Sequence, residues 1–263
     1  MLKQQDLETR RKTAELIDEL SLGVTLASEP IRIGTEIAHF FYSQDKRNSV
    51  YPLKWLIWSK LSHIFGDMYP TNTGLSPDRE LIMQKVMFDQ IWEQSLTEIV
   101  DMIANKKAPV PDFKELALEA NEAITKVSDK FKTYKQVFEQ ELAGSLRSYF
   151  PVAQKILEEI FERGGYVLPV QPSRKAGIAN LSPTLHIHAL CHASVRWDKK
   201  RKFKGNDIYD FYHAAAAIPY CDVFFTEGPL QAMLEANHLK INQEFDCKII
   251  SSVSDAVAFL EKE

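Results

Sequence analysis

Cysteine is scarce in this chain, with only Cys191, Cys221 and Cys247 among 263 residues. An odd, small number without paired spacing fits a reducing compartment better than a disulfide framework. Glycine and proline are also few, at 10 and 12 residues, and there is no low-complexity tract. We therefore expect a chain that folds throughout. Its length suffices for one large domain, or for one domain that carries a sizeable insertion.

Long apolar runs are absent as well. No stretch of about 18 apolar residues occurs, so the sequence predicts no membrane-spanning helix. Residues 1–12 are charged and helix-prone, and they lack the apolar core of a signal peptide. Together these absences predict a soluble, cytoplasmic protein.

The chain has no excess of positive charge. Its formal net charge is −4 and its pI is near 6.0. The field of the whole molecule will therefore not gather nucleic acid, and any such binding requires a local basic patch.

The first 43 residues alternate helix and strand. Residues 3–22 have helical spacing of apolar side chains, and Gly23 is a typical C-terminal cap. A short β-rich run follows at 24–27, and a second helix is predicted over about 30–43. This order is typical of an α/β fold.

Residues 44–165 have a different, nearly all-helical character. Apolar side chains recur at helical spacing from Pro52 to Met68, and Ser76-Pro77 starts a long helix that we expect to reach about Asn105. Helical patterns resume from Asp112 to about Leu146 and from Pro151 to Arg163. The block is predicted to be a helical hairpin or bundle inserted into the α/β unit.

After a linker at about 166–182 the α/β pattern returns. Helices are predicted over 183–197, from Asn206 to Pro219, over 228–239 and over 255–260, and strands over 223–226 and 248–250. Short connections between alternating helices and strands imply a parallel sheet covered by helices.

Three carboxylates stand out by position. Asp210 lies in the first turn of an alanine-rich helix, Glu227 follows the strand 223–226, and Glu36 lies one turn into the helix after strand 24–27. Loops at the carboxyl ends of parallel strands form ligand sites, and clustered carboxylates suit Mg²⁺ or Mn²⁺. The alternative is that first-turn acids such as Asp207 and Asp210 only stabilise the helix dipole.

A basic loop, Lys199–Lys204, precedes these acids. Lys202 and Lys204 are candidates for contact with a phosphate backbone, and Trp197 and Phe203 could stack on bases. His213, one turn beyond Asp210, is a candidate for a phosphate contact or for orienting that acid. The alternatives are a solvated linker and a histidine bonded to a backbone carbonyl.

Two further groups of side chains are candidates for binding. His188 and His192 share a helix face beside Cys191, which suits zinc, although no second cluster completes a tetrahedral site. Trp55 and Trp58 share another face, which suits a partner surface but also core packing.

The C-terminal pattern resembles the C-terminal half of a PIN domain. Asp210–Ala217 and Val223–Glu227 match its order of acid, alanine-rich helix, apolar strand, Thr and acid. Residues 206–227 are also similar to a bacterial PIN-like subgroup of uncharacterised proteins. Glu36 is similar to the family's acid on the helix after its second strand. The resemblance covers about 20–43 and 183–261.

This resemblance implies fold and activity. It implies a PIN-like parallel sheet in a domain formed by residues 1–43 and 166–263, with a helical insertion over 44–165. The implied activity is Mg²⁺- or Mn²⁺-dependent phosphodiester hydrolysis on RNA, with a toxin or defence role by analogy with small PIN proteins. Glu36, Asp210 and Glu227 would hold the metal, assisted by Asp207.

The sequence departs from the PIN pattern at its start. The family begins with an apolar strand that ends in Asp, and no such run precedes residue 20. The resemblance then implies either a chain that begins late relative to a longer gene product or the loss of one ligand. The missing acid favours an alternative function. The protein would be a catalytically impaired PIN-like module that binds nucleic acid, a protein partner or a second copy, with the helical insertion as the contact surface.

Overall fold

The chain forms two compact units. The computed structural model describes residues 6–44, 46, 48–63, 74–105, 119, 130–162, 178–239 and 241–262. Unit 1 comprises residues 1–28 and 54–111, and unit 2 comprises residues 29–53 and 112–263.

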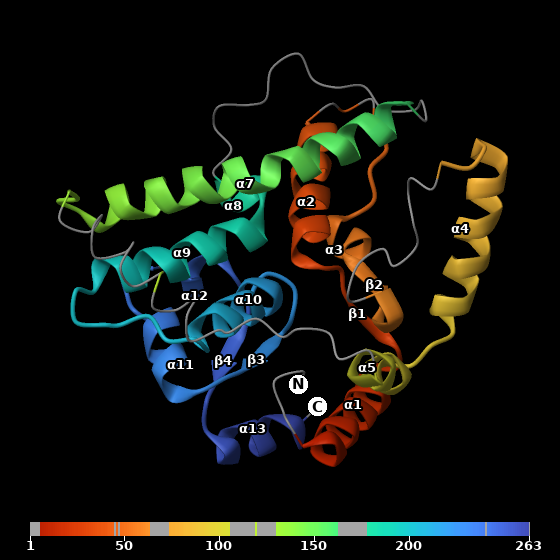
Figure 1. Ribbon diagram of the computed structural model, residues 1–263. Helices are drawn as coiled ribbons and strands as arrows, with labels where there is room; N and C mark the ends of the chain where they lie inside the picture. The colour runs from red at the N-terminus through yellow and green to blue at the C-terminus, as the bar shows by residue number, and fades with distance from the viewer. Residues whose placement is uncertain are drawn as a thin grey trace. The chain divides into compact units, whose positions relative to one another are not determined.

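Unit 1 combines helices with one short antiparallel sheet (Figure 1). Its described elements are α1 (Leu7–Ser21), β1 (Val24–Leu26), most of α3 (Leu53–Leu56), β2 (Trp58–Lys60), the 3-10 helix η1 (Leu61–His63), α4 (Pro77–Trp92) and α5 (Leu96–Asn105). β1 pairs antiparallel with β2, so that Val24 lies opposite Lys60. A small core lies between α1, η1 and α5, formed by Ala14, Leu61, Leu96 and Val100.

Local chemistry fixes the ends of α1 and α5. The Asp6 carboxylate accepts from the Thr9 N–H at 2.8 Å and begins α1. Leu22 and Gly23 both have positive φ, at 51° and 75°, and this left-handed turn ends the helix. Asp18 of α1 accepts from the N–H groups of Leu96 (2.7 Å) and Thr97 (3.0 Å), so α1 also caps α5.

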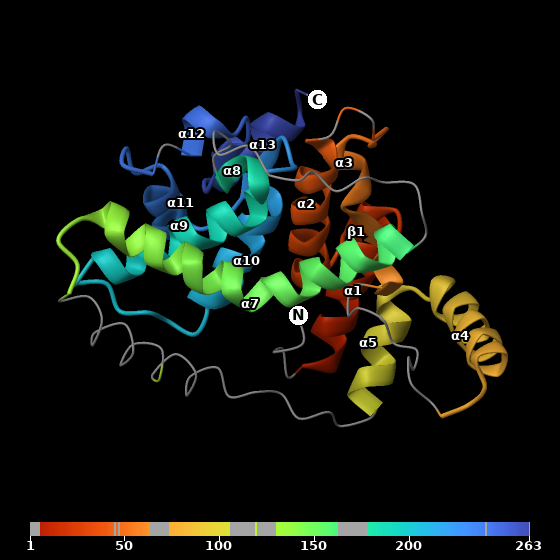
Figure 2. The same cartoon turned by 90° about the horizontal axis from the view of Figure 1, so that it is seen from above.

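Unit 2 is built around a long helix that crosses two others. Its described elements are α2 (Glu29–Ser43), α7 (Tyr134–Glu162), α8 (Ile178–Leu181), α9 (Pro183–Trp197), α10 (Asp207–Ala217), β3 (Val223–Phe225), α11 (Gly228–Leu234), α12 (Ile241–Glu244), β4 (Lys248–Ile250) and α13 (Val253–Leu260). α7 runs antiparallel to α9 at its first half and crosses α2 at its second half (Figures 1 and 2).

Gly34 permits the close contact between α2 and α7. A Cβ at this position would lie 2.6 Å from Ile156 Cδ1 and 3.4 Å from Val152 Cγ1. Around this contact, Ile33, Ile37, Ala153 and Leu185 form one of the buried clusters of unit 2.

The larger core of unit 2 lies under a single parallel pair of strands. β3 pairs with β4 in register, with Val223 opposite Lys248 and Phe225 opposite Ile250. Helices α11 and α12 connect the two strands. The core beneath them is formed by Leu190, Phe211, Ala214, Leu230, Leu234, Ile249 and neighbouring apolar side chains of α9, α10 and α11.

The PIN-like parallel sheet predicted from the sequence is wrong. The described residues are mostly helical, and their four strands of three residues each form two separate two-stranded sheets. The predicted sheet does not form because strand 24–26 pairs with a different strand from the one expected. It pairs antiparallel with Trp58–Lys60 in unit 1, and so it does not join β3 and β4.

Several individual elements are confirmed. α9 spans the predicted 183–197, α2 and α10 lie within a residue or two of the predicted bounds, and the strands at 223 and 248 are present. Ser76 is the N-cap residue of α4 and Pro77 its first residue, as predicted. Among the described residues, no helix is long and apolar enough to cross a membrane.

Other elements differ from prediction. The helix expected over Pro52–Met68 is described only to residue 63, where it is a single turn followed by strand β2 and the 3-10 helix η1. The helix expected to reach Asn105 is interrupted between Trp92 and Leu96. Pro151 lies inside the continuous helix α7 instead of starting a new one. The predicted helix from Asp112 falls outside the described residues up to residue 129, apart from 119, as does most of the predicted linker.

Candidate functional site

Glu36 is buried in unit 2 at 1% exposure. The hydroxyls of Ser182, Thr184 and Tyr220 donate to its carboxylate, and Arg32 Nε donates to Thr184 Oγ1 at 2.9 Å. Burial raises the pKa of the Glu36 carboxyl, and the hydrogen bonds from these hydroxyls oppose the rise. Its oxygens therefore hold α2 against the start of α9 and the turn after α10.

The other two predicted acids lie elsewhere in unit 2. Asp210 is half-buried in the first turn of α10, and Glu227 is exposed after β3 as the N-cap residue of α11. Glu36 contacts Tyr220, which lies beyond the opposite end of α10. Because a helix rises 1.5 Å per residue, the length of α10 from Asp210 onward is roughly 10 Å. Glu36 is thus bound near the amino end of β3, whereas Glu227 follows its carboxyl end.

Asp207 orders the basic loop. It is buried at 7% exposure, and it accepts from the Lys204 N–H at 2.8 Å and from the Arg201 guanidinium at 3.3 Å. These bonds fold the loop back onto the start of α10. The side chains of Lys202, Lys204 and His213 are exposed.

The described residues do not fit the implied Mg²⁺ or Mn²⁺ site. Such an ion takes several oxygen ligands in one place. Within the described ranges, no group of three or more His, Cys, Asp or Glu side chains could hold a metal ion. The position of Glu36 agrees with this result, because its oxygens are occupied by its own hydrogen-bonded network.

The histidines of α9 face different surroundings. His188 and His192 stack with ring centroids 4.4 Å apart, but His186 lies 2.9 Å from Glu244 Oε2 and packs on Phe138. Cys191 belongs to the apolar core. These side chains do not converge on one zinc position.

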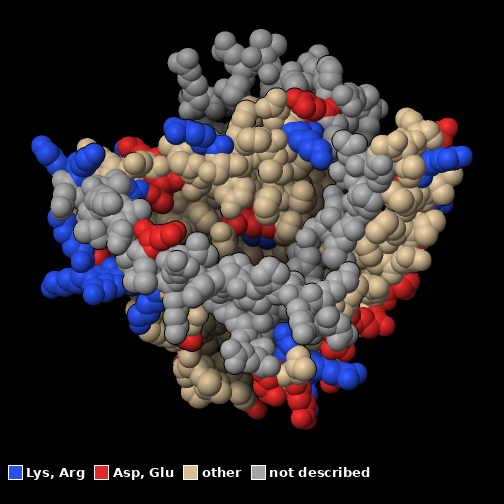
Figure 3. Space-filling model, viewed as in Figure 1, with Lys and Arg blue, Asp and Glu red and all other residues tan. Residues whose placement is uncertain are grey.

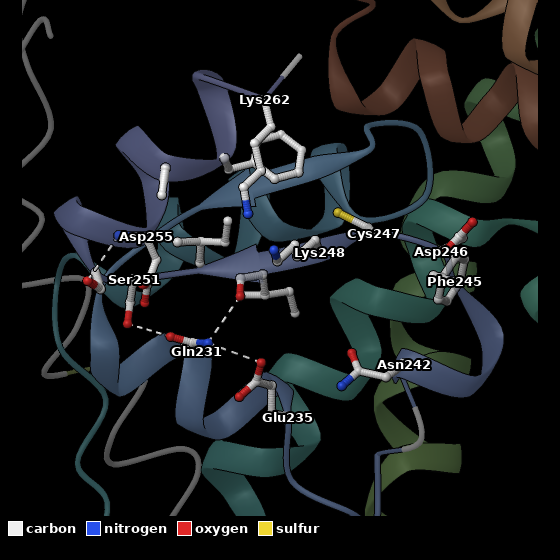
Figure 4. A pocket seen from close by; sticks show the side chains of 15 residues that line it. Gln231, Glu235, Asn242, Phe245, Asp246, Cys247, Lys248, Ser251, Asp255 and Lys262 are labelled. Atoms are coloured by element: carbon white, nitrogen blue, oxygen red, sulfur yellow. Dashed lines mark hydrogen bonds between the residues drawn. The ribbon is translucent and has the colours of Figure 1, made fainter.

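A first pocket of about 710 Å³ lies beside β4. Figure 4 shows Gln231 reaching from α11 to Ser251, while Lys248 extends from β4 and Lys262 from the turn after α13. Gln231 Nε2 also donates to the Ile249 carbonyl at 3.0 Å, and Lys248 Nζ lies 5.2 Å from the Phe259 ring centroid. The Gln231 side chain is therefore bonded within the protein, and the described contacts show no set of groups directed at a ligand.

A second pocket of about 700 Å³ is a groove between α7, α9 and α10. We call it the α7–α9–α10 groove. It is lined by Tyr149 and Arg147 from α7, His188, His192 and Arg196 from α9, Phe203 before α10 and Tyr212 within it. Arg196 is paired with Glu141 and donates to Gln140 at 3.1 Å. The walls therefore combine aromatic rings, imidazoles and cations with the carboxylate of Glu141, which also lines the groove.

A carboxylate lies behind His188 in this groove. Glu29 Oε1 is 3.2 Å from His188 Nδ1, and the Tyr149 hydroxyl donates to Glu29 Oε2 at 2.7 Å. Both side chains of the Glu29–His188 pair are largely buried, at 13% and 10% exposure. The two facing atoms are close but are not aligned as a hydrogen bond. Burial lowers the pKa of the neighbouring His192 to about 3, so that ring is neutral.

Exposed lysines gather at one end of the groove. Figure 3 shows Lys and Arg side chains along the left edge of the view, where Figure 1 places the connection from α9 to α10 and the start of α7. Tyr134 and Phe131 contact Trp197 and Arg196 there, which brings the two segments together. The basic patch comprises the exposed residues Lys130, Lys132, Lys135, Lys199, Lys200, Lys202 and Lys204.

No known protein family, curated protein or solved structure matches this chain. The geometry of unit 2 is therefore the basis for a functional assignment.

The charge of the loop predicts Lys202 and Lys204, whereas no pattern in the sequence predicts Glu29, Tyr149 or Tyr212. Phe203, a candidate for stacking on bases, is instead buried in the apolar core at 4% exposure. In the sequence, Glu29 is an ordinary first-turn acid before Pro30. No local signal links it to His188, because the two meet only when α2 packs beside α9.

Proposed function

We propose that unit 2 binds single-stranded RNA along a path from the basic patch into the α7–α9–α10 groove. Two segments far apart in sequence supply the seven lysines, and a groove that carries the exposed ring of Tyr212 and the half-buried ring of Tyr149 begins where they meet. This juxtaposition is the observation that carries the proposal. Lysines attract the phosphate backbone, and aromatic rings stack on unpaired bases.

The architecture of the loop supports this function. Its backbone is tied at two points, because the Lys204 N–H donates to Asp207 and the Lys200 N–H donates to Asp198. Because the net charge of the whole chain is −4, a concentrated patch is what nucleic-acid binding requires here. The proposal follows the second function that the sequence predicted, a nucleic-acid-binding module. Metal-dependent hydrolysis stays an untested prediction.

The test is fluorescence anisotropy of a labelled single-stranded RNA titrated with the full chain at several salt concentrations. A quadruple variant carries Lys199→Gln, Lys200→Gln, Lys202→Gln and Lys204→Gln. We expect it to bind about tenfold or more weakly at moderate salt, and the slope of log affinity against log salt to fall by about 2 to 3.

The matched control removes four exposed lysines outside the basic patch: Lys12→Gln, Lys46→Gln, Lys54→Gln and Lys85→Gln. Its affinity should fall much less than that of the loop variant. Equal losses in both variants would mean that only net charge matters, and absence of binding at low salt would refute the function.

A further inference from the structure

We propose that the Glu29–His188 pair makes the α7–α9–α10 groove a metal-independent site of RNA cleavage. The inference rests on the proposed RNA binding and adds a reaction to it. A general base needs a ring nitrogen in a substrate cleft and a second group that orients the ring. His188 lines the groove, and Glu29 and Tyr149 stand behind it.

The orientation of His188 follows from its contacts. Nδ1 lies 3.2 Å from Glu29 Oε1 without the alignment of a hydrogen bond, and the other ring nitrogen, Nε2, is the one that we assign to the groove. The groups that face this ring are Glu29 from α2, Tyr149 from α7, His192 from α9 itself and Tyr212 from α10. Only one of them is a carboxylate, and it is held in place by the Tyr149 hydroxyl. Glu29 is therefore a positioning residue, whereas His188 is the catalytic residue.

RNA carries its own nucleophile beside each phosphodiester. His188 Nε2 takes the proton of a ribose 2′-hydroxyl, and O2′ forms a bond to the adjacent phosphorus. The bond from phosphorus to O5′ breaks. The leaving O5′ takes a proton from water, and the resulting hydroxide takes the proton from His188, which restores the neutral ring. The products are a 2′,3′-cyclic phosphate and a 5′-hydroxyl, with no change in oxidation state. Arg147, on the groove wall, is placed to contact the phosphate charge.

The experiment measures RNA binding and cleavage separately, in the presence of EDTA. The full chain should cleave a labelled single-stranded RNA and leave 2′,3′-cyclic phosphate ends. The wild-type chain should not cleave a substrate with 2′-deoxyribose at every position. This measurement tests the role of the 2′-hydroxyl without any protein variant. His188→Gln should lose about 100-fold or more in cleavage rate while RNA affinity stays within about twofold. The matched control is His238→Gln, an exposed histidine outside the groove.

The role of Glu29 needs a second readout. Glu29→Gln should lower kcat about tenfold while KM stays within about twofold, because the carboxylate positions the base and does not touch RNA. Glu29→Asp, which keeps a carboxylate, should recover part of the rate. A merely structural role would change KM and thermal unfolding together with kcat, and aspartate would not rescue it.

The outcomes separate the two proposals. RNA that binds but is not cleaved in EDTA overturns the cleavage site and leaves the binding function intact. Cleavage of the deoxy substrate, or wild-type rates in His188→Gln, also overturns it. If RNA does not bind at all, the proposed function fails and this inference fails with it.

Discussion

At the scale of single residues, Glu36 shows how a correctly located acid can have a different role. The sequence placed it on the helix after strand 24–27, and the structure confirms that helix as α2, with Glu36 about two turns from its start. Its partners Ser182, Thr184 and Tyr220 come from segments far along the chain. Spacing in the sequence predicts which helix carries a side chain, but it does not predict which distant segment packs against it.

The pH dependence of stability should report the buried Glu36. Since burial holds its folded-state pKa above the usual 4.5, folding favours the protonated form. Its contribution is therefore fully present below about pH 4.5 and is lost as pH rises through the folded-state value. We expect Glu36→Gln to reduce the fall in unfolding free energy between about pH 5 and pH 8. Chemical denaturation at both pH values checks this, with the exposed Glu261→Gln as control. Equal pH dependence in the wild type and Glu36→Gln would contradict it.

Asp18 is the clearest stabilising cap in unit 1. Its carboxylate accepts from the N–H groups of Leu96 and Thr97 and from the Thr97 hydroxyl at 2.8 Å. Asp18→Ala leaves the first turn of α5 without these acceptors, so we expect a loss of about 1–2 kcal/mol in unfolding free energy. Thermal unfolding followed by circular dichroism measures this loss. The neighbouring exposed Glu19→Ala should change stability by less than about 0.5 kcal/mol. Similar losses in the two variants would remove the capping argument.

At the scale of elements, local signals predicted helices well and strand partners poorly. Ser182 and Pro183 mark the start of α9, and the Ser182 hydroxyl accepts from the Leu185 N–H as an N-cap residue does. Strand β2 gave no such signal, because its neighbours Leu53, Leu56 and Leu61 follow helical spacing. Pairing with β1 overrides that pattern, and this kind of tertiary preference is not visible in a short window.

The crossing of α2 and α7 depends on the absence of a side chain at Gly34. Gly34→Val adds atoms where Ile156 and Val152 already lie, so we expect about 1–3 kcal/mol of destabilisation. Gly144→Val is the matched control, because Gly144 lies inside α7 with nothing within 4 Å of its added Cβ. This control should be neutral or slightly stabilising, since valine has a higher helix propensity than glycine. Denaturant titration of both variants separates steric from propensity effects. A stable Gly34→Val would show that the helices can move apart at little cost.

At the scale of the whole molecule, the sequence predicted the parallel pairing of two strands but not how the strands divide between sheets. The β3–β4 pair is parallel, as the order of helices and strands implied. The step from two strands to a larger sheet failed because β1 belongs to unit 1. Charge gave a more reliable large-scale inference. A net charge of −4 required a local patch. Contacts of Phe131 and Tyr134 with Arg196 and Trp197 bring the segment that carries Lys130, Lys132 and Lys135 to the end of α9, where the predicted basic loop begins.

Metal dependence separates the function predicted from resemblance and the one supported by geometry. If Asp210 and Glu227 hold Mg²⁺ or Mn²⁺, then Asp210→Asn combined with Glu227→Gln should abolish both Mn²⁺ binding in calorimetry and any RNA cleavage. If the α7–α9–α10 groove is the site, the double variant should cleave RNA at the wild-type rate, and EDTA should have no effect. We expect the second result, because Glu36 is committed to Ser182, Thr184 and Tyr220 and the described residues form no group of three metal ligands. Cleavage that depends on Mn²⁺ and is lost in the double variant would instead restore the carboxylate mechanism. The other metal ligands would then have to come from residues outside the described ranges.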